Sequence, residues 1–586
     1  MARGPSYLVG IDFGTTYSGV AWALDGSTGS DEDITLVSTW QDKSNRTYAK
    51  VPSVIAYDKA RREKWGYQVD ACTESFRGIK LLLDEDQKFD YAQSLASRKL
   101  LELCNKDAVQ VTADYLECLI KHSKKIMMKD RLMPDEANMN LRFVLTVPAV
   151  WSDKAKDATM RAAIQAGISA EDLSLISEPE AAALHALRKV LPDSFSENDV
   201  FVVCDAGGGT VDLISYQIKT LEPLELVEVT EGTGRACGSM FLDDRFEDLL
   251  RGRMGADKYD SLSNVSKDAV RSYWQERVKP YYTGRQEKSE VPIASSISYS
   301  DSKDSDTISE DEYAETDKFI PIAGAKDDPT IPIVEGCFPL SPGDLENIFE
   351  PIIRDVEELV AGQIADITRL GRSTKAIVLV GGFGSSHYLF RRLQEGNPAV
   401  RIVQPEDAWS AVVRGAVHRG LQGNQVESRI ARQHYGTRCS QVWLSDVHGP
   451  KNKYWDDLEE IYRANEMSWI IKKSSPMYED QPVKLDFYVS VHVDNAESKL
   501  LRHITFYRCN SAKAPKVEDD SLIKLCTLEA DLTKIPRSLF VKRRNSKGVE
   551  YYDISYVLVM TSASAALIFE LQFEGMSYGS VRSKYY

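Results

Sequence analysis

The chain has 586 residues, a length that suggests about four compact units, and its 43% hydrophobic and 27% charged residues exclude a disordered or fibrous protein. Its formal net charge of -16 argues against a nucleic-acid-binding surface, because such surfaces neutralise phosphates with Lys and Arg. The nine cysteines include no C-x-x-C pair, which indicates neither a zinc site nor a disulfide framework and favours a cytoplasmic or nuclear protein.

The first part of the chain, residues 1–198, has the pattern of an α/β unit. Short apolar and β-branched runs closed by Gly, Pro or Asp predict strands at Val9–Asp12, Gly19–Leu24, Val51–Tyr57 and Arg142–Val147. The spacing of apolar residues predicts helices at Tyr91–Cys104, Thr112–Lys129 and Ser152–Ile168. Because strands that alternate with helices are typical of α/β domains, we expect a first α/β lobe here.

The same pattern starts again at residue 199 and continues to residue 423. It predicts strands at Phe201–Cys204 and Leu213–Gln217, helices at Asp243–Arg253, Lys267–Val278 and Gly343–Arg369, and a strand, glycine turn and helix over Lys375–Leu393. The acidic segment Ser298–Asp317 is predicted to be a mobile loop. We therefore expect a second α/β lobe over residues 199–423.

After residue 423 the period of the apolar residues becomes two. Apolar and polar residues alternate in Lys484–Asp494, Arg502–Cys509, Leu522–Leu532 and Tyr551–Met560, which predicts half-buried strands. The apolar stretch Ser555–Leu571 contains Ser, Thr and Glu570 and falls short of the roughly 18 uninterrupted apolar residues that span a membrane, so we interpret it as strands. Residues 429–586 are predicted to form a β-rich C-terminal domain, a small sandwich.

One short pattern occurs twice, once in each predicted lobe. "VGIDFGTTYSG" (Val9–Gly19) and "VVCDAGGGTVDL" (Val202–Leu213) each contain an apolar run, an Asp, a glycine turn and a Thr. Glycine lets backbone N–H groups converge on an anion without a Cβ in the way, and a carboxylate beside phosphates suits hydrated Mg²⁺. This chemistry singles out Asp12, Gly14, Thr15 and Thr16 in the first turn and Asp205, Gly207, Gly208, Gly209, Thr210 and Asp212 in the second.

A single turn of this kind is more often an ordinary hairpin, but two turns in two lobes can hold a polyphosphate chain between them. A third turn, "VGGFGSS" (Val380–Ser386), contains Gly381, Gly382 and Phe383. Tight packing of a strand on a helix would also explain its glycines, whereas at a corner of the same cleft it suits the adenosine end of a nucleotide. The chain has no G-x-x-x-x-G-K-[ST] motif and no G-x-G-x-x-G after a strand, which argues against a P-loop enzyme and a dinucleotide site.

The order of several motifs resembles one family over about Tyr7–Leu421. These motifs are "IDFGTTYSG", "VPSVIAY", "FVLTVPAVWSDKAKDATMRAAIQAG", "ISEPEAAALHAL", "CDAGGGTVDL", "IVLVGGFG" and "QPEDAWSAVVRGAV". They resemble the nucleotide-binding domain of the seventy-kilodalton heat-shock protein family, which has the two-lobed actin-like ATPase fold with ribonuclease H-like lobes. "GGFGSSHYLFRRL", "DAWSAVVRGAV" and the ending "YGSVRSKYY" are most similar to a divergent branch, heat-shock seventy-kilodalton protein twelve and its fungal relatives.

The resemblance implies roles for individual residues. It implies phosphate contacts for Gly14, Thr15, Thr16, Tyr17, Gly208, Gly209 and Thr210, and roles in the Mg²⁺ shell or in orienting water for Asp12, Glu178, Asp205 and Asp212, with Asp12 and Asp205 as metal ligands. "WQERVKPYYTG" (Trp274–Gly284) resembles the family's adenosine-binding helix, which places Glu276, Lys279 and Thr283 near ribose and adenine. Pro148 stands where the family has a proline implicated in signalling between domains, and Lys156 stands in place of an Arg that follows it.

Several features of the family have no counterpart here. Tyr67–Ser75 holds no basic residue at the place of the family's catalytic lysine, and Arg77 and Lys80 are the nearest cations. The basic residue that stacks on adenine is replaced near Ser385. Gln422–Gly436 is polar and basic where the family has a short apolar linker, and we expect no counterpart of the family's helical lid, because the residues after 429 read as strands. We therefore expect slow hydrolysis and only a modest effect of nucleotide on partner affinity.

These features predict an atypical chaperone-like protein that binds ATP or ADP with Mg²⁺ between two lobes and hydrolyses ATP slowly or not at all. The alternatives are a nucleotide-sensing scaffold without turnover and a sugar-type kinase on the same fold, which would leave the β-rich domain unexplained. Besides the nucleotide, the expected partner is an extended or unfolded polypeptide, or another protein, at the C-terminal domain. No nucleic acid and no membrane span are expected.

Overall fold

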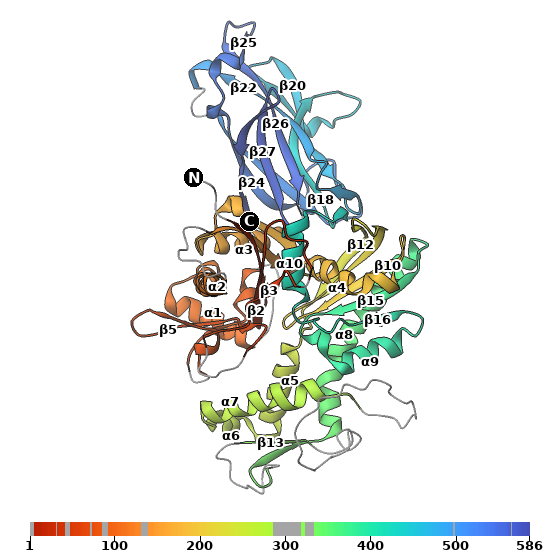
Figure 1. The fold of residues 1–586 in the computed structure, drawn as a ribbon. Coiled ribbons are helices and arrows are strands. Elements are labelled where there is room, and N and C mark those ends of the chain that lie inside the picture. The colour runs from red at the N-terminus through yellow and green to blue at the C-terminus, as the bar shows by residue number, and fades with distance from the viewer. Residues whose placement is uncertain are drawn as a thin grey trace.

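The computed structural model describes residues 5–30, 32–41, 47–70, 73–84, 92–130, 139–284, 318–322, 333–495, 499–563 and 565–585. Figure 1 shows two α/β lobes side by side and a β-sandwich above them. The predicted fold class, a two-lobed α/β region followed by a β-rich domain, is confirmed. The predicted loop Ser298–Asp317 lies outside the described residues.

The first lobe is built on a sheet that we call the lobe I sheet. Its strands are β1 (Ser6–Phe13), β2 (Tyr17–Leu24), β3 (Thr35–Leu36), β4 (Val51–Pro52), β8 (Asn140–Val147) and β9 (Leu173–Ser177). The order is β3-β2-β1-β8-β9, with β4 paired to β2; β1 is antiparallel to β2 and parallel to β8. A small sheet and three helices complete the lobe: β5 (Val54–Tyr57), β6 (Glu63–Trp65), β7 (Phe76–Arg77), α1 (Ala92–Cys104), α2 (Ala108–Asp130) and α3 (Asp153–Gln165). Ser152 caps α3, because its hydroxyl accepts a hydrogen bond from the Ala155 amide.

The second lobe repeats this arrangement on the lobe II sheet. Its strands are β10 (Val200–Ala206), β11 (Val211–Thr220), β12 (Glu225–Arg235), β15 (Thr374–Val380), β16 (Arg401–Val403), β17 (Val426–Ile430) and β21 (Pro476–Tyr478). The order is β16-β15-β10-β11-β12-β17-β21, with β10 antiparallel to β11 and parallel to β15. The pair β10–β11 therefore corresponds to β1–β2, and each pair carries one of the doubled glycine turns between its strands.

The outer part of the second lobe lies below the sheets in Figure 1. It contains α5 (Met240–Met254), α6 (Ala256–Ser261), α7 (Asn264–Tyr273), β13 (Lys318–Pro321), β14 (Cys337–Leu340), α8 (Pro342–Arg369) and α9 (His387–Gly396). The helix predicted over Lys267–Val278 changes to a π-helix at Trp274–Val278. There the Trp274 ring stacks on Phe246 at 4.3 Å and its Nε1 donates to Asp243 Oδ1 at 2.8 Å, which fixes the altered turn.

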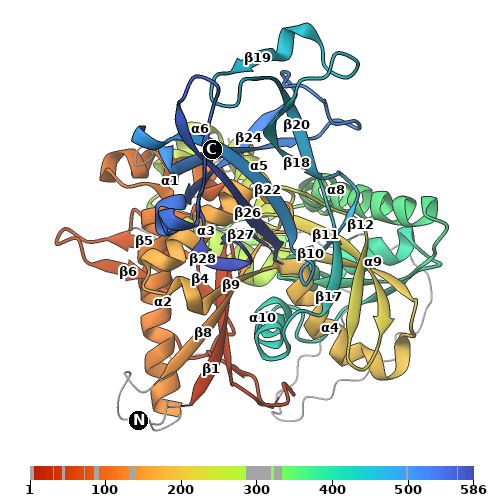
Figure 2. The same cartoon turned by 90° about the horizontal axis from the view of Figure 1, so that it is seen from above.

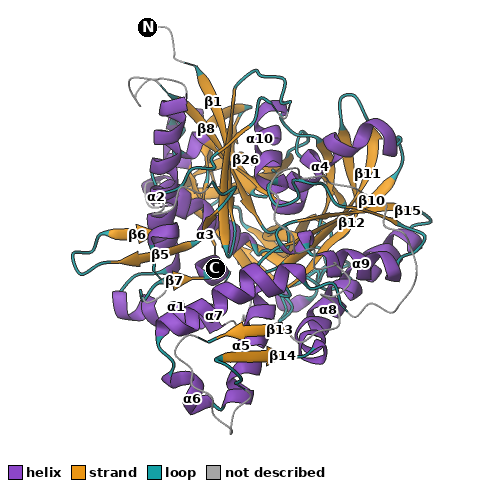
Figure 3. Ribbon diagram, turned by 60° about the horizontal axis from the view of Figure 1, so that its bottom comes forward, coloured by secondary structure: helices purple, strands orange, loops and turns teal. Residues whose placement is uncertain are grey.

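Two helices lie between the sheets of the lobes, α4 (Glu178–Ser194) and α10 (Ala411–Gln422) (Figure 3). A Cβ on Gly415 of α10 would overlap the Ala181 carbonyl of α4, so the two backbones touch. Val413 and Val417 of α10 pack against residues of β2 in the lobe I sheet. A helix that comes late in the sequence therefore completes the core of the first lobe.

The C-terminal β-sandwich consists of two sheets with orders β19-β20-β18-β23-β24-β29 and β22-β26-β27-β28, β25 being paired to β26. Its strands are β18 (His434–Val442), β19 (Lys453–Asp456), β20 (Ile461–Ile471), β22 (Val483–His492), β23 (Leu501–Cys509), β24 (Ile523–Asp531), β25 (Val541–Arg544), β26 (Glu550–Ser562), β27 (Leu567–Phe573), β28 (Met576–Ser580) and β29 (Arg582–Tyr585). Figure 2 shows these strands lying over the two lobes. The alternation in β22 is confirmed, since Leu485 and Val491 face the sandwich core while Asp486 and Tyr488 are exposed.

The sandwich is joined to the lobe II sheet by two strands. β17, from the polar segment Gln422–Gly436, runs parallel to β12, and β21 pairs with the other edge of β17. The segment docks on the lobe II sheet although it is polar, and Val426 and Ser428 of β17 are buried there. After α10 the described residues form strands and short 3-10 turns. No helix in the described part of the chain is long and apolar enough to cross a membrane.

Candidate nucleotide site

The first glycine turn joins β1 to β2 and is held by hydrogen bonds from Ser53. Asp12 lies near the end of β1 and is buried, and the Gly14–Thr16 turn follows it directly. The Ser53 hydroxyl donates to Gly14 O at 2.7 Å, and the Ser53 amide donates to Thr16 O at 2.8 Å. The turn is therefore fixed by the residue that links β4 to β5.

The second turn joins β10 to β11 and is held by the start of α5. The Gly207 amide donates to Thr210 O at 2.9 Å and closes this turn. The amides of Met240 and Gly238 donate to Gly208 O at 2.9 Å and Gly209 O at 3.2 Å. Because the amides of Gly238, Ser239 and Met240 at the start of α5 donate to three carbonyls of the turn, movement of the outer part of the second lobe would move the turn with it.

The two turns meet directly. A Cβ on Gly208 would overlap the Thr16 hydroxyl, and a Cβ on Gly209 would lie 2.7 Å from Thr15 Oγ1. The third turn lies against the second: Gly381 has φ +88°, and a Cβ there would overlap Asp205 Oδ1. Gly382 follows, and Phe383 opens a buried 3-10 turn. All three glycine turns thus meet at one place between the lobes.

Four buried carboxylates surround the turns, namely those of Asp12, Glu178, Asp205 and Asp212. Glu178 begins α4, and Asp205 and Asp212 are registered partners across the β10–β11 hairpin. Burial raises the pKa of Glu178 to about 7 although Lys80 opposes the shift. Burial, followed by repulsion from Glu178, Asp212 and Asp12, raises the pKa of Asp205 well above its ordinary value. Burial also raises the pKa of Asp212, although Asp212 accepts hydrogen bonds from Thr210 and Val150. Crowded carboxylates of this kind favour a cation.

Two lysines of the first lobe neutralise part of this charge. Lys50 Nζ lies 2.6 Å from Asp12 Oδ2, and Lys80 Nζ lies 2.5 Å from Glu178 Oε1. Both lysines are buried, and the Lys80 ammonium lies 5.5 Å from the centre of the Trp151 ring. The four carboxylates, when ionised, still outnumber the two ammonium groups by two charges.

Of the predicted adenosine residues, Glu276 lies in the π-helix, and Lys279 and Thr283 follow it. Lys279 Nζ donates to Asp243 Oδ1 at 2.8 Å. Partial burial raises the pKa of the Tyr17 hydroxyl, and the charges of Asp243 and Glu276 raise it further. Thr283 is half-buried beyond the π-helix, and none of the described interactions joins it to the glycine turns.

Sequence reasoning missed two residues at this place, Lys50 and Trp409. Trp409 contacts the Tyr17 ring edge-on at 5.9 Å and would lie 3.5 Å from a Cβ on Gly382, so it stands between the first and third turns. Neither residue belongs to a sequence motif that would have predicted its place in the site. Lys80 had a usable signal, because it interrupts the apolar run "GIKLLL", and a lone lysine in such a run indicates a buried ion pair.

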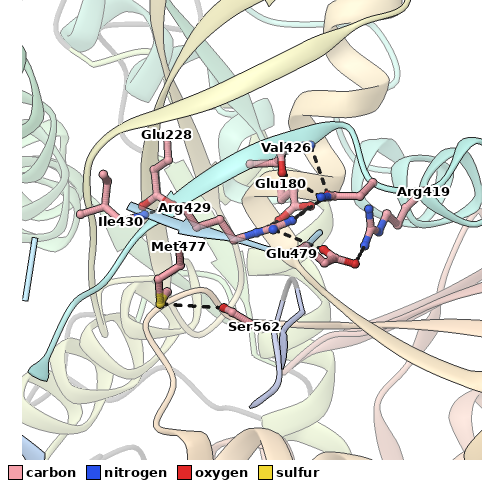
Figure 4. Close-up of polar contacts among 10 residues, drawn as sticks. Glu180, Glu228, Arg419, Val426, Arg429, Ile430, Met477, Glu479 and Ser562 are labelled. Carbon is pink, nitrogen blue, oxygen red and sulfur yellow. Dashed lines mark hydrogen bonds and ion pairs between the residues drawn. The ribbon is translucent and has the colours of Figure 1, made fainter. Parts of the chain in front are cut away.

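Below the sandwich a second cluster of buried charges joins three parts of the chain (Figure 4). Arg429 of β17 binds Glu180 of α4 at 2.8 Å and Glu479, next to β21, at 3.3 Å. Arg419 of α10 binds Glu479 at 2.7 Å. Glu228 of β12 accepts a hydrogen bond from the Ile430 amide at 3.2 Å. Glu180 lies two residues after Glu178, so this cluster adjoins the carboxylates of the glycine turns.

Comparison with known proteins agrees with this geometry. The model of the family described as Hsp70 protein matches residues 8–258, which include both doubled turns and Glu178. Heat shock 70 kDa protein 12A of Mus musculus is 24% identical over 90% of this chain and 85% of its own length. Heat shock 70 kDa protein 12B of Homo sapiens is 24% identical over 79% of this chain and 76% of its own length. Chaperone protein DnaK of Thermosipho africanus is 26% identical over 72% of this chain and 61% of its own length. The part of the chain that holds both turns therefore matches the Hsp70 protein family, and most of the chain is similar to the divergent heat shock 70 kDa proteins 12A and 12B.

Proposed function

We propose that the protein binds Mg-ATP and Mg-ADP between its lobes, hydrolyses ATP slowly or not at all, and acts as a chaperone-like protein. The observation that carries the proposal is the direct meeting of the two Asp-Gly-Thr turns, in which Gly208 and Gly209 leave no room for a Cβ beside Thr16 and Thr15. Glycines at such positions let backbone N–H groups approach phosphate oxygens closely. A polyphosphate chain is the ligand that two such turns can share.

The residues also fit Mg²⁺. Among the described residues no three His, Cys, Asp or Glu side chains converge closely enough to hold a metal by themselves. Mg²⁺ commonly keeps several waters and takes one or two carboxylates together with substrate phosphates, and Asp12 and Asp205 are the carboxylates that we assign to it. When bound, Mg²⁺ would neutralise charge on the phosphates and the excess charge of the four carboxylates.

The residues of the chain would then act mainly by positioning. Thr15, Thr16 and Thr210 would bind phosphate oxygens, and Glu178 and Asp212 would orient water. Phosphoryl transfer depends on such positioning and on positive charge near the transferred group, and the loss of one preorganised donor typically costs about 10²–10³ in rate. Because Tyr67–Ser75 contains no basic residue, we propose turnover well below that of a typical family member.

Thermal unfolding with and without Mg-ATP tests the proposed site. A ligand at about 100 times its dissociation constant adds roughly 2.7 kcal/mol to stability, so the melting temperature should rise. Gly208→Asp and Thr15→Val should abolish the rise, whereas Gly252→Asp, at an exposed position of α5 with no neighbour near its Cβ, should keep it. If the melting temperature of the wild-type protein changes with neither Mg-ATP nor Mg-ADP, the proposed site is wrong.

Phosphate release by the same protein separates the alternatives. Slow release that needs no sugar supports the chaperone-like function. Binding without release supports a nucleotide-sensing scaffold, and release that requires a sugar supports a kinase.

For the partner we propose an extended polypeptide that pairs with β19, the edge strand of one sandwich sheet. Trp455 of β19 and Tyr462 of β20 are 45% and 48% exposed, and their rings contact edge-on at 4.9 Å. An exposed edge offers backbone hydrogen bonds, and neighbouring aromatic rings offer apolar contact. Binding of a fluorescent extended peptide to the full chain should weaken in Trp455→Ala and remain in Trp469→Ala, a half-buried tryptophan bonded to Pro515 O.

A further inference from the structure

We propose that Lys50 binds phosphate in the nucleotide site and supplies, from the segment before β4, the positive charge that Tyr67–Ser75 lacks. This inference rests on the proposed function and assigns a further residue to that same site. Lys80, the other buried lysine, is assigned to positioning Glu178.

The backbone beside Lys50 is tied to the first glycine turn. β4, which begins at the next residue, pairs with β2 so that Pro52 faces Tyr17. Ser53 bonds two carbonyls of the turn, at 2.7 Å and 2.8 Å. The position of Lys50 is therefore set by the same hydrogen bonds that hold the turn, and it cannot move away from the turn without breaking them.

The side chain of Lys50 runs back along the turn. A Cβ on Gly19 would lie 3.3 Å from Lys50 Cγ and 3.5 Å from Lys50 Cε, so the glycine provides the surface along which the stem lies. The ammonium ends 2.6 Å from Asp12 Oδ2, directly before the turn. An ammonium has three N–H donors, so Lys50 can keep its bond to Asp12 and donate to a phosphate oxygen at the turn as well.

The Lys50 ammonium lies at the start of the first turn, which the second turn meets. Asp12, its partner, comes just before the Gly14–Thr16 turn, and Gly208 and Gly209 of the second turn approach Thr16 and Thr15 of the first. This location suits attraction of a phosphate chain that both turns hold.

Lys80 is placed differently. Its ammonium binds Glu178 Oε1 and lies over the Trp151 ring, and its charge opposes the rise in the pKa of Asp212. Glu178 and Asp212 are the carboxylates assigned to orienting water. An ion pair of this kind fixes the carboxylate at the start of α4. We therefore expect replacement of Lys80 to change turnover and its dependence on pH more than affinity.

Calorimetric titration of the full chain with Mg-ATP and Mg-ADP tests the assignment. Lys50→Met should weaken Mg-ATP binding by about 10- to 100-fold, the usual effect of losing a hydrogen bond from a charged donor. Lys50→Arg should recover part of the affinity. Lys59→Met, which removes an exposed lysine at the turn after β5, should leave both affinities unchanged.

Removal of Lys50 leaves the buried Asp12 without this ion pair, so the melting temperature of each variant without nucleotide is measured first. If Lys50→Met does not fold, Lys50→Gln keeps a donor toward Asp12 and is used instead. A folded Lys50→Met or Lys50→Gln protein with wild-type affinity for Mg-ATP overturns the assignment. A wild-type protein that binds neither nucleotide refutes the proposed function itself, which is a different result.

Discussion

Glu228 is a buried carboxyl outside the nucleotide site that changes its charge near neutral pH. It is 5% exposed and faces Arg432, Arg429 and Glu180 as well as the Ile430 amide. Burial raises its pKa to about 7, and the two arginines only partly oppose the shift. Its protonation state therefore affects the contact between β12 and β17.

The stability of the protein should depend on pH through this residue. The folded protein holds the Glu228 proton up to about pH 7, whereas the unfolded chain releases it above the ordinary value of 4.5, so stability is lost as the pH rises between these values. The loss is worth up to about 3 kcal/mol, since one pKa unit corresponds to about 1.4 kcal/mol. Glu228→Gln should melt above the wild type at pH 8 and close to it at pH 4.5. Equal differences at both pH values would contradict the assignment.

The residues of the glycine turns could be predicted because their pattern is local. A strand, an Asp, a glycine turn and a Thr are adjacent in the chain, and the backbone alone brings them to one point. Lys50 could not be predicted in this way, because its partner Asp12 is 38 positions away and the lysine follows no spacing rule. Trp409 likewise reaches Tyr17 only through the packing of one lobe on the other.

At the scale of the elements, α4 and α10 pack with their backbones in contact. Gly415→Ala would push a methyl group into the Ala181 carbonyl, which cannot move without distorting α4. Overpacking of this kind costs about 1–3 kcal/mol. Gly362→Ala, at an exposed position of α8 with an open Cβ direction, should instead stabilise the helix by about 0.5–1 kcal/mol. Thermal unfolding of the two variants should therefore show shifts of opposite sign, and two shifts of the same sign would contradict the close approach.

Most helices and strands could be predicted because each buries an apolar face of regular period. β22, β23, β24 and β26 fall within a residue or two of the predicted ranges. β21 could not be predicted, because it has three residues, begins with a proline and gains its strand geometry only by pairing with β17. The docking of β17 was hidden by its polar residues, since Arg429 is buried through ion pairs rather than through apolar contacts.

At the scale of the whole molecule, Arg429 links the first residues of α4, the lobe II sheet and the sandwich. Arg429→Met would leave the buried Glu180 without this cation, while Glu479 would keep Arg419, and breaking a buried ion pair on one side typically costs about 3–5 kcal/mol. Arg543→Met is the matched control, because Arg543 forms an exposed ion pair with Asp553, and such pairs are worth about 0–1 kcal/mol. The melting temperature should fall strongly in the first variant and little in the second. Similar small losses in both would show that Arg429 does not hold the sandwich to the lobes.

This connection bears on the expected modest effect of nucleotide on partner affinity. That expectation depended on the missing apolar linker, but β17 and β21 continue the sheet that carries Asp205, and Arg429 contacts a helix that begins at the site carboxylate Glu178. The physical route for coupling is therefore present. Peptide affinity measured with Mg-ATP and with Mg-ADP should show whether the expectation of a small difference is met.

The return of α10 to the lobe I sheet also sets an order for folding during synthesis. Chains emerge N-terminus first, and domains that are complete in sequence can fold as they emerge. Here the sheet containing β1 and β8 lacks the helix that covers it until residue 422 has left the ribosome, and the lobe II sheet lacks its last strand until Tyr478 has done so. Neither lobe can therefore complete its packing as soon as its own strands are made, and the nascent chain carries its apolar β1 and β8 surface uncovered until most of the protein has been made.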